Sequence, residues 1–321
     1  IVSAFLGKTM TDVLRKLLEL PSDTAIEIAG KSEKSLGLVE IPEIFVDNTD
    51  RNRTSPFAFT GNRFEFRAVG SSANCAGAIT TLNSAVADQL LTFKKTVDIE
   101  LEKGKPQNVA IMDALKPIIA SIIDVICFDG NGYSDEWHKE AKRRGLDVET
   151  SVPEMISAFT RKDSVEMFAR VGVYSEKELE ARNEVKWETY SKKIQIEARV
   201  IGRMAINHII PTALSYQKKL LENIALMKQV FPDSYEQQAD TEIAIVKQIS
   251  ALTTDLRRKV DDMIEARKEA NVIISEYEKA KAYYLIAESL FGIRTLVDTL
   301  EEIVDNDMWP LPKYRELLFI N

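Results

Sequence analysis

Residues 50–67 read DRNRTSPFAFTGNRFEFR and hold the densest pattern in the chain. Phe57–Phe59 predicts a short strand, Thr60–Asn62 a tight turn containing glycine, and Arg63–Val69 a second strand. This order predicts a β-hairpin in a chain that elsewhere has mostly helical composition.

The second strand of this hairpin has two unlike faces. Alternate residues of a strand share a face, so Arg63, Glu65 and Arg67 point to one side and Phe64 and Phe66 to the other. Neighbours on one face lie about 6.6 Å apart. We expect the two phenylalanines to anchor the strand to a core, while the other face presents a cation, an anion and a cation in a row.

Two interpretations of that charged face remain open on patterning alone. It is either a solvated edge strand with a ladder of charges, or a site for an anionic substrate and a metal ion. Arginine forks bind carboxylate and phosphate groups, and a glutamate between them can hold a divalent cation near the same phosphates.

The segments on either side of the hairpin give weaker signals. Apolar spacing predicts a helix over residues 9–20, which Pro21 ends. Residues 25–28 and 43–46 are short strand candidates, and a helix is expected over residues 76–93.

The second half of the chain has the composition of long helices. A Ser-x-x-Glu capping box at residues 151–154 marks a helix start. Helical composition then continues to Val230 with an interruption at Pro211, and residues 231–233 (Phe-Pro-Asp) mark a reversal. We therefore expect a bundle of long antiparallel helices after a boundary near residue 150.

The helix after the reversal carries an apolar stripe with spacings of three and four. Its members are Ile249, Leu252, Leu256, Val260 and Met263. Such a stripe packs against another helix of the same chain, or else docks a partner protein.

Composition limits the classes of function. The chain has 321 residues, 45% of them hydrophobic and 29% charged, with a net charge of −8. This balance argues against a nucleic-acid-binding face and against adhesion to anionic membranes. No run of about 18 apolar residues predicts a membrane span. The chain begins at Ile1 without a methionine, and we expect further residues upstream.

Cysteine and histidine are scarce. Cys75 and Cys127 form no C-x-x-C pair and are expected to be reduced, structural cysteines. His138 and His208 stand alone, which argues against a histidine-rich metal site and against a Ser-His-Asp triad.

The hairpin sequence resembles the C-terminal active-site segment of glutamine synthetases. The run from Asn52 to Arg67 is similar to the long bacterial type III subgroup in particular. Further segments resemble that subgroup: residues 3–7, 68–72, 128–134 and 144–146, with Trp137 and Ala141. The resemblance implies an α+β fold, with residues 1–150 as the C-terminal part of the catalytic domain, made of antiparallel strands with helices. Residues 151–321 would be the all-α C-terminal extension of type III enzymes.

The resemblance implies a ligase of glutamine biosynthesis and nitrogen metabolism. ATP would phosphorylate the side-chain carboxylate of glutamate, and ammonia would displace phosphate from the γ-glutamyl phosphate intermediate. Two or more Mg²⁺ or Mn²⁺ ions per site would assist. A cytoplasmic homododecamer of two hexameric rings is the implied assembly.

The resemblance also assigns roles to residues of the hairpin. Arg53 would contact the ATP phosphates, and Arg63 would lie on the nucleotide side. Glu65 would ligate a metal ion, and Arg67 would bind substrate glutamate. At Ala58 shorter members of the family carry another arginine that contacts the nucleotide, so no such role is assigned there. The family's other metal ligands would lie upstream of Ile1, and the chain alone is expected to be inactive.

One further alternative concerns the substrate. A glutamine-synthetase-like ligase that joins glutamate to another amine would carry the same strand, because amine selection depends on other residues. An assembly or interaction role for the helical part is the alternative of a different class.

Overall fold

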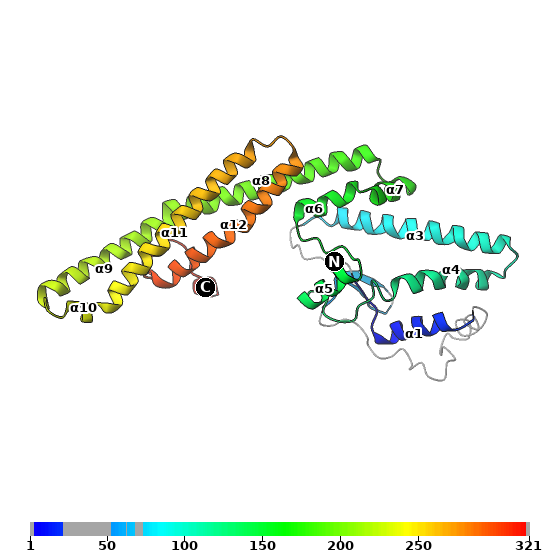
Figure 1. Cartoon of the computed structure of the whole chain (residues 1–321), viewed down its shortest axis with the longest axis horizontal. Coiled ribbons are helices and arrows are strands. Elements are labelled where there is room, and N and C mark those ends of the chain that lie inside the picture. Colours follow the sequence, from blue (N-terminus) through cyan, green and yellow to red (C-terminus); the bar gives the residue numbers. More distant parts are fainter. Residues whose placement is uncertain (1–2, 22–52, 62, 68–72, 319–321) are drawn as a thin grey trace. The chain divides into compact units, whose positions relative to one another are not determined.

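The chain is described by a computed structural model, which covers residues 3–21, 53–61, 63–67 and 73–318 (Figure 1). The strand candidates at residues 25–28 and 43–46 lie outside these ranges. Two compact units divide the chain. Unit 1 contains residues 1–150 and Arg161–Glu176, and unit 2 contains Ser151–Thr160 and Lys177–Asn321. The chain therefore passes between the units three times, after residues 150, 160 and 176.

Unit 1 combines a small sheet with helices. Its elements are β1 (Ala4–Phe5), α1 (Lys8–Glu19), β2 (Phe57–Phe59), β3 (Phe64–Phe66), α3 (Ala76–Glu102), α4 (Gln107–Ile122), α5 (Asp135–Arg143) and α7 (Lys162–Arg170). The helix predicted over residues 9–20 is confirmed as α1. The helix predicted over residues 76–93 is present, and it extends nine residues further, to Glu102.

The sheet has the order β1-β2-β3. β2 and β3 form the predicted antiparallel hairpin, with Ala58 opposite Glu65 and Phe59 opposite Phe64. β1 pairs with β2 in parallel, so the sheet is mixed and the expectation of purely antiparallel strands was wrong in this respect. The reason is that β1 arrives from a segment some fifty residues upstream rather than through a hairpin, so no tight turn fixes its direction.

Unit 2 is helical throughout its described residues. Its elements are α6 (Val152–Ser157), the 3₁₀ turn η1 (Ala158–Thr160), α8 (Glu176–Met204), the π-helical turn η2 (Ala205–Ile209), α9 (Ile210–Val230), α10 (Tyr235–Gln238), α11 (Asp240–Asn271), α12 (Glu276–Ile303) and α13 (Tyr314–Leu317). α11 packs against both α9 and α12, and the chain reverses at residues 231–234, as predicted. Figure 1 shows α9, α11 and α12 running side by side.

The apolar stripe of α11 lies in the core of unit 2. Ile249, Leu256 and Val260 are fully buried, and Met263 is nearly so. Ile293 and Leu300 of α12 belong to the same cluster. Because the stripe is used within the chain, it offers no surface to a partner protein, and the alternative that rested on it loses its basis.

Two local predictions in unit 2 were wrong. The helix does not break at Pro211: it continues from α8 into α9 through η2, where the Ile210 N–H donates to the Ala205 carbonyl five residues earlier. The wider π turn accommodates the proline ring that a regular α turn would reject. At the start of α6, the Ser151 side chain makes no capping hydrogen bond, so the Ser151 half of the predicted capping box is not formed. One oxygen of the Glu154 carboxylate accepts a hydrogen bond from the Tyr277 hydroxyl.

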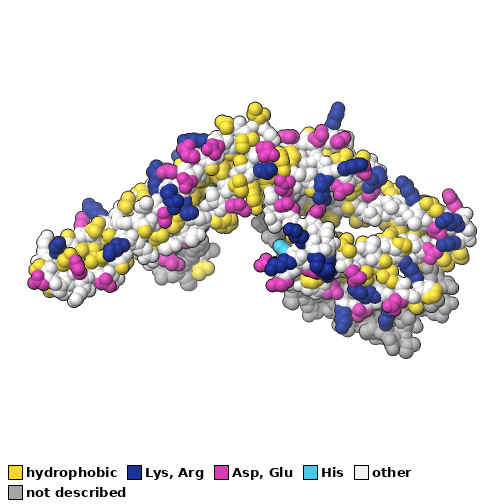
Figure 2. Space-filling model, in the orientation of Figure 1, with side chains coloured by type: hydrophobic (Ala, Val, Ile, Leu, Met, Phe, Trp, Pro, Cys, Tyr) yellow, Lys and Arg dark blue, Asp and Glu magenta, His cyan; other side chains and the backbone are white. Residues whose placement is uncertain are grey.

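None of the described helices is long and apolar enough to cross a membrane. On the face drawn in Figure 2, acidic and basic side chains are interspersed over the helices. His138 lies in unit 1 and His208 in unit 2, and both cysteines are free thiols.

Candidate active-site hairpin

Three of the predicted site residues lie together on β3 and its ends. Arg63 Nη2 lies 3.5 Å from Glu65 Oε1, and Arg67 Nη2 lies 3.2 Å from Glu65 Oε2. The structure thus confirms that the three side chains share a face. The Glu65 carboxylate bridges two guanidinium groups, which leaves the trio with one net positive charge.

The side chains of Arg63, Glu65 and Arg67, here called the trio, differ in their exposure to solvent. The side chain of Arg67 is 17% exposed, that of Glu65 38% and that of Arg63 68%. The hydrogen bond from Arg67, assisted by Arg63 and opposed by partial burial, holds the pKa of Glu65 below its ordinary value. Glu65 is therefore an anion at neutral pH, available to a cation, while the exposed Arg63 is available to an anion.

The turn of the hairpin fixes the position of Arg63. The Thr60 N–H donates to the Arg63 carbonyl at 2.8 Å, and the Arg67 N–H donates to the Pro56 carbonyl at 2.7 Å. Gly61 has φ 95°, a left-handed conformation that favours glycine. The register places Ala58 directly opposite Glu65, where it is fully buried. An arginine side chain has no room at this position.

The aromatic face of the hairpin is not anchored in a core, contrary to the sequence expectation. Phe57 and Phe64 stack with ring centroids 4.9 Å apart, and Phe59 also contacts Phe64. Phe64 is nevertheless 46% exposed and Phe66 41%. The rings of Phe57, Phe59 and Phe64 thus pack on one another, and the rings of Phe64 and Phe66 remain partly exposed.

Arg53 precedes the hairpin and is exposed. It is the one non-glycine residue of the described chain with positive φ, at 53°. A residue with a Cβ seldom adopts this left-handed conformation, and strained positions of this kind cluster at functional sites. Among the described residues, no hydrogen bond or ion pair links Arg53 to the trio.

Segments far apart in sequence form hydrogen bonds with the residues that precede β2. The Gly132 N–H donates to the Thr54 carbonyl at 2.7 Å, and a Cβ on Gly132 would lie 3.1 Å from that oxygen. The Ser55 hydroxyl donates to the Ser3 carbonyl. β1 also bridges to Cys127. The residue stretches 3–7, 53–60 and 127–134, which share the family resemblance, thus form one structural unit.

Asp129 organises a second part of this unit. Its carboxylate accepts hydrogen bonds from the N–H groups of Leu6 and Gly7, and from the Thr11 hydroxyl in the first turn of α1. Trp137 stacks on Phe128 with centroids 3.9 Å apart. The hydrogen bonds that Asp129 accepts at the start of α1 join segments more than a hundred residues apart, and the sequence pattern of residues 128–134 does not reveal them.

The described residues do not assemble a complete metal site. No group of three or more His, Cys, Asp or Glu side chains lies close enough together in them to hold an ion. Glu65 is a suitable oxygen donor for a hard divalent cation. Its two oxygens contact arginines, so a cation would replace at least one of these contacts.

The chain carries a recognisable family signature. Residues 110–228 match the glutamine synthetase C-terminal domain. This range lies downstream of the hairpin and includes residues 128–134 and 144–146, two of the segments whose sequence resembles the type III subgroup.

Named relatives agree with this match. Over 99% of its length, the chain is 46% identical to a glutamine synthetase of Bacteroides fragilis, covering 44% of that protein. It is 32% identical to a type-3 glutamine synthetase of Dictyostelium discoideum, over the whole chain and 43% of the relative. A glutamine synthetase of Butyrivibrio fibrisolvens is 27% identical, with 44% of its length covered. These findings confirm the resemblance to glutamine synthetases, and the chain spans less than half the length of these relatives.

Proposed function

We propose that this chain is the C-terminal part of an ATP-dependent glutamate–ammonia ligase, a glutamine synthetase of type III. The observation that supports this proposal best is the Arg63–Glu65–Arg67 trio on a hairpin, in a chain that resembles glutamine synthetases over its full length. The roles of the individual residues, the metal ions and the dodecameric assembly belong to this proposal.

In the proposed reaction, each member of the trio acts on a different group. Arg67, the most buried of the three, is held in place by its backbone bond to Pro56 and binds the carboxylate of glutamate. The more exposed Arg63, together with Arg53, binds the phosphates of ATP. Two positive groups beside the transferring phosphoryl group stabilise the charge that develops on its oxygens.

Glu65 provides the anionic component. It would supply one oxygen ligand to a divalent cation, and a bound cation contributes charge neutralisation at the phosphates. When the cation is absent, Glu65 keeps the two guanidinium groups oriented. The remaining ligands and the residues that select the amine are proposed to lie in the part of the polypeptide that corresponds to the rest of the relatives' length.

The test is glutamine formation from glutamate, ammonium and ATP–Mg²⁺ by the complete polypeptide, with Glu65→Ala as the variant. We expect kcat to fall about 100-fold or more, because a metal ligand beside the transferring group is lost. Glu136→Ala is the matched control, since Glu136 is an exposed glutamate of unit 1 that makes no ion pair with any described residue.

Three outcomes separate the alternatives. Full activity of Glu65→Ala would make the trio structural and refute the site assignment. A wild-type protein that is inactive with ammonium and active with another amine would place it among the glutamate–amine ligases. Loss of activity in Glu136→Ala to the same extent would show a general effect of removing charge.

A further inference from the structure

An arginine-lined pocket lies within unit 2, between α8 and α11. Its volume is about 350 Å³. Arg199 and Arg203 contribute from α8, Arg267 from α11, and Asn207 from η2, over an apolar lining that includes Met263. None of the lining side chains is a carboxylate.

These three arginines differ from Arg257 and Arg258, two other arginines of α11. Arg257 is paired with Asp261 at 2.9 Å and Arg258 with Asp255 at 3.1 Å. In the described part of the chain, Arg199, Arg203 and Arg267 have no ion pair. Because the protein as a whole is acidic, three unpaired cations around one hollow need an explanation.

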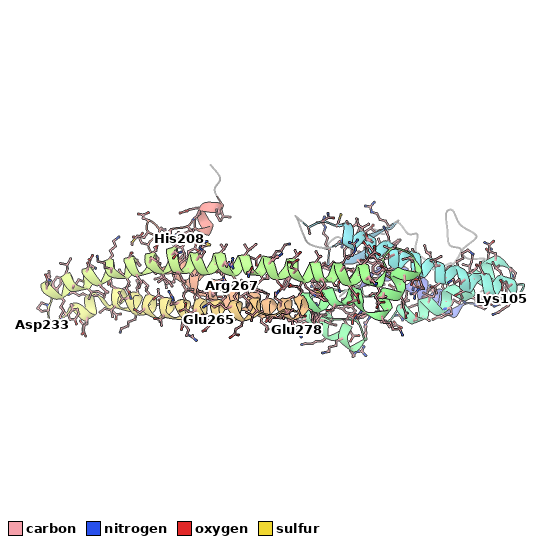
Figure 3. All side chains as sticks on the ribbon, turned by 90° about the horizontal axis from the view of Figure 1, so that it is seen from above. Lys105, His208, Asp233, Glu265, Arg267 and Glu278 are labelled. Carbon is pink, nitrogen blue, oxygen red and sulfur yellow. The ribbon has the colours of Figure 1, made fainter. Side chains whose placement is uncertain are left out.

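The Nε–H group of Arg267 also lacks a partner within the described ranges. Its Nε–H is buried and has no hydrogen-bond partner among the described residues. A buried donor without an acceptor is costly, and native proteins satisfy nearly all such groups. In Figure 3, Arg267 is labelled between the ribbons of α8 and α11, whereas Glu265 lies toward the opposite side of α11, where it pairs with Lys268.

The backbone around the pocket departs from a regular helix pair. A Cβ on Gly202 would lie 3.0 Å from Met263 Cε, so glycine permits the close approach of α8 to α11 at the pocket. The π-helical turn η2 then brings Ile206 and Asn207 into the lining. Single π turns occur frequently at functional sites. Arg199 and Arg203, four residues apart, also repel each other along α8, a cost that a bound anion would offset.

We propose that this pocket binds a small molecule that joins an oxyanion, in the first place a phosphate monoester, to a compact apolar group. The guanidinium forks of Arg203 and Arg267 and the amide of Asn207 bind the oxyanion, and the buried Nε–H of Arg267 finds its acceptor there. The apolar lining accepts the rest of the ligand, and the volume is in the range of small-ligand pockets, about 300–1,000 Å³. This site is separate in sequence from the hairpin and independent of the ligase proposal.

The experiment is calorimetric titration of the purified protein at low salt with phenyl phosphate, inorganic phosphate and benzoate. We expect phenyl phosphate to bind at one site per chain, and more tightly than inorganic phosphate, which lacks the ring. Arg203→Gln and Arg267→Gln are each expected to weaken binding about tenfold or more, because each removes a charge-assisted hydrogen bond. A preference for benzoate would instead identify a carboxylate as the natural oxyanion, within the same proposal.

Two controls keep the test decisive. Arg257→Gln removes an ion-paired arginine of the same helix and should leave the affinity unchanged. Arg63→Gln reports on the anion-binding residues proposed at the hairpin, and loss of the measured binding in that variant would place the anion there and overturn the pocket assignment. Thermal melts by circular dichroism check that each variant is folded. If Arg267→Gln is unstable, Arg203→Gln, at an exposed position, serves as the test variant.

The proposal is overturned if none of the three anions gives saturable heat. It is also overturned if Arg257→Gln weakens binding as much as Arg203→Gln, which would indicate diffuse attraction. Equal affinities for phenyl phosphate and inorganic phosphate would refute the proposal that the apolar lining binds an apolar group of the ligand.

Discussion

The two units bury apolar surface in different ways. In unit 2, long stripes on α11 and α12 face each other, and large residues such as Leu256 and Ile293 are fully buried. In unit 1, the described core cluster on α3 and α4 is small, with Val97, Ala110 and Ala114 at its centre. α3 leaves Ile79, Val86 and Leu90 at least half exposed, although their spacing marks an apolar face.

Polar and aromatic contacts take a larger part in unit 1. Asp88 of α3 binds Arg170 of α7 through two hydrogen bonds of 2.8 and 2.9 Å. Asp129 accepts hydrogen bonds at the start of α1, and Arg144 lies over the Trp137 ring while donating to the Cys127 carbonyl. Among the described residues, unit 2 thus has the larger apolar core, and directional contacts join segments of unit 1 that are distant in sequence. A repeating apolar pattern in the sequence predicts the fold of unit 2 better than the fold of unit 1.

The largest expected effect compares leucines of the two units. Leu256→Ala should lower the free energy of unfolding by about 2–5 kcal/mol, because it leaves a cavity in the core of unit 2. Leu90→Ala should change it by no more than about 0.5 kcal/mol, because Leu90 is 61% exposed. Urea denaturation followed by circular dichroism measures both.

The contrast between the units fails if the two variants are equally destabilised. A large cost for Leu90→Ala would mean that the apolar face of α3 is covered in solution.

A smaller effect is expected for Tyr277→Phe, which removes the hydroxyl that donates to Glu154 and so one hydrogen bond between α6 and α12. The cost should be about 1–2 kcal/mol, measured by urea denaturation. The hydrogen bond to Glu154, together with burial, raises the pKa of Tyr277 to about 12. Because the raised pKa favours the protonated hydroxyl, this contribution is complete below the unfolded value of 10 and is lost as the pH rises through about 12. Tyr133→Phe, at an exposed tyrosine of unit 1, is the control and should be neutral.

The smallest effect is expected at Glu140, in the polar network of unit 1. Hydrogen bonds from Arg143 and Arg144 lower the pKa of Glu140 to about 2. A lowered pKa stabilises the folded state above the unfolded value of 4.5, and this contribution is lost as the pH falls from there toward 2. Glu140→Gln should therefore melt slightly below the wild type at pH 7 and together with it near pH 2. A difference that persists at pH 2 would show that the contribution is not electrostatic, and Glu136→Gln should show no difference at either pH.

The sequence predicted those features that depend on local periodicity. The burial of Ile249, Leu256 and Val260 follows from their spacing, and the reversal at Pro232 follows from turn chemistry. The shared face of Arg63 and Glu65 follows from strand alternation.

Features that depend on a distant partner were missed or wrong. The Ser151 side chain makes no capping hydrogen bond, and Glu154 accepts a hydrogen bond from Tyr277, 123 residues later, which no local pattern reveals. Pro211 does not end the helix because a π turn absorbs it. Arg199 and Arg203 show the i, i+4 spacing in sequence, but only the packing of α11 adds Arg267 to them.

The three passages of the chain between the units have a consequence for the order in which a nascent polypeptide can fold. The Asp88–Arg170 contact becomes available once Arg170 has emerged from the ribosome, so unit 1 can close around α7 early. Residues 151–160 have emerged by then, whereas Tyr277, which binds Glu154, is still to come. At about 5–20 residues per second, Glu154 waits roughly 6–25 s for it. During translation α6, which lies between two parts of unit 1 in sequence, can therefore contact Trp187 of α8, which donates to the Pro153 carbonyl, well before it can contact Tyr277.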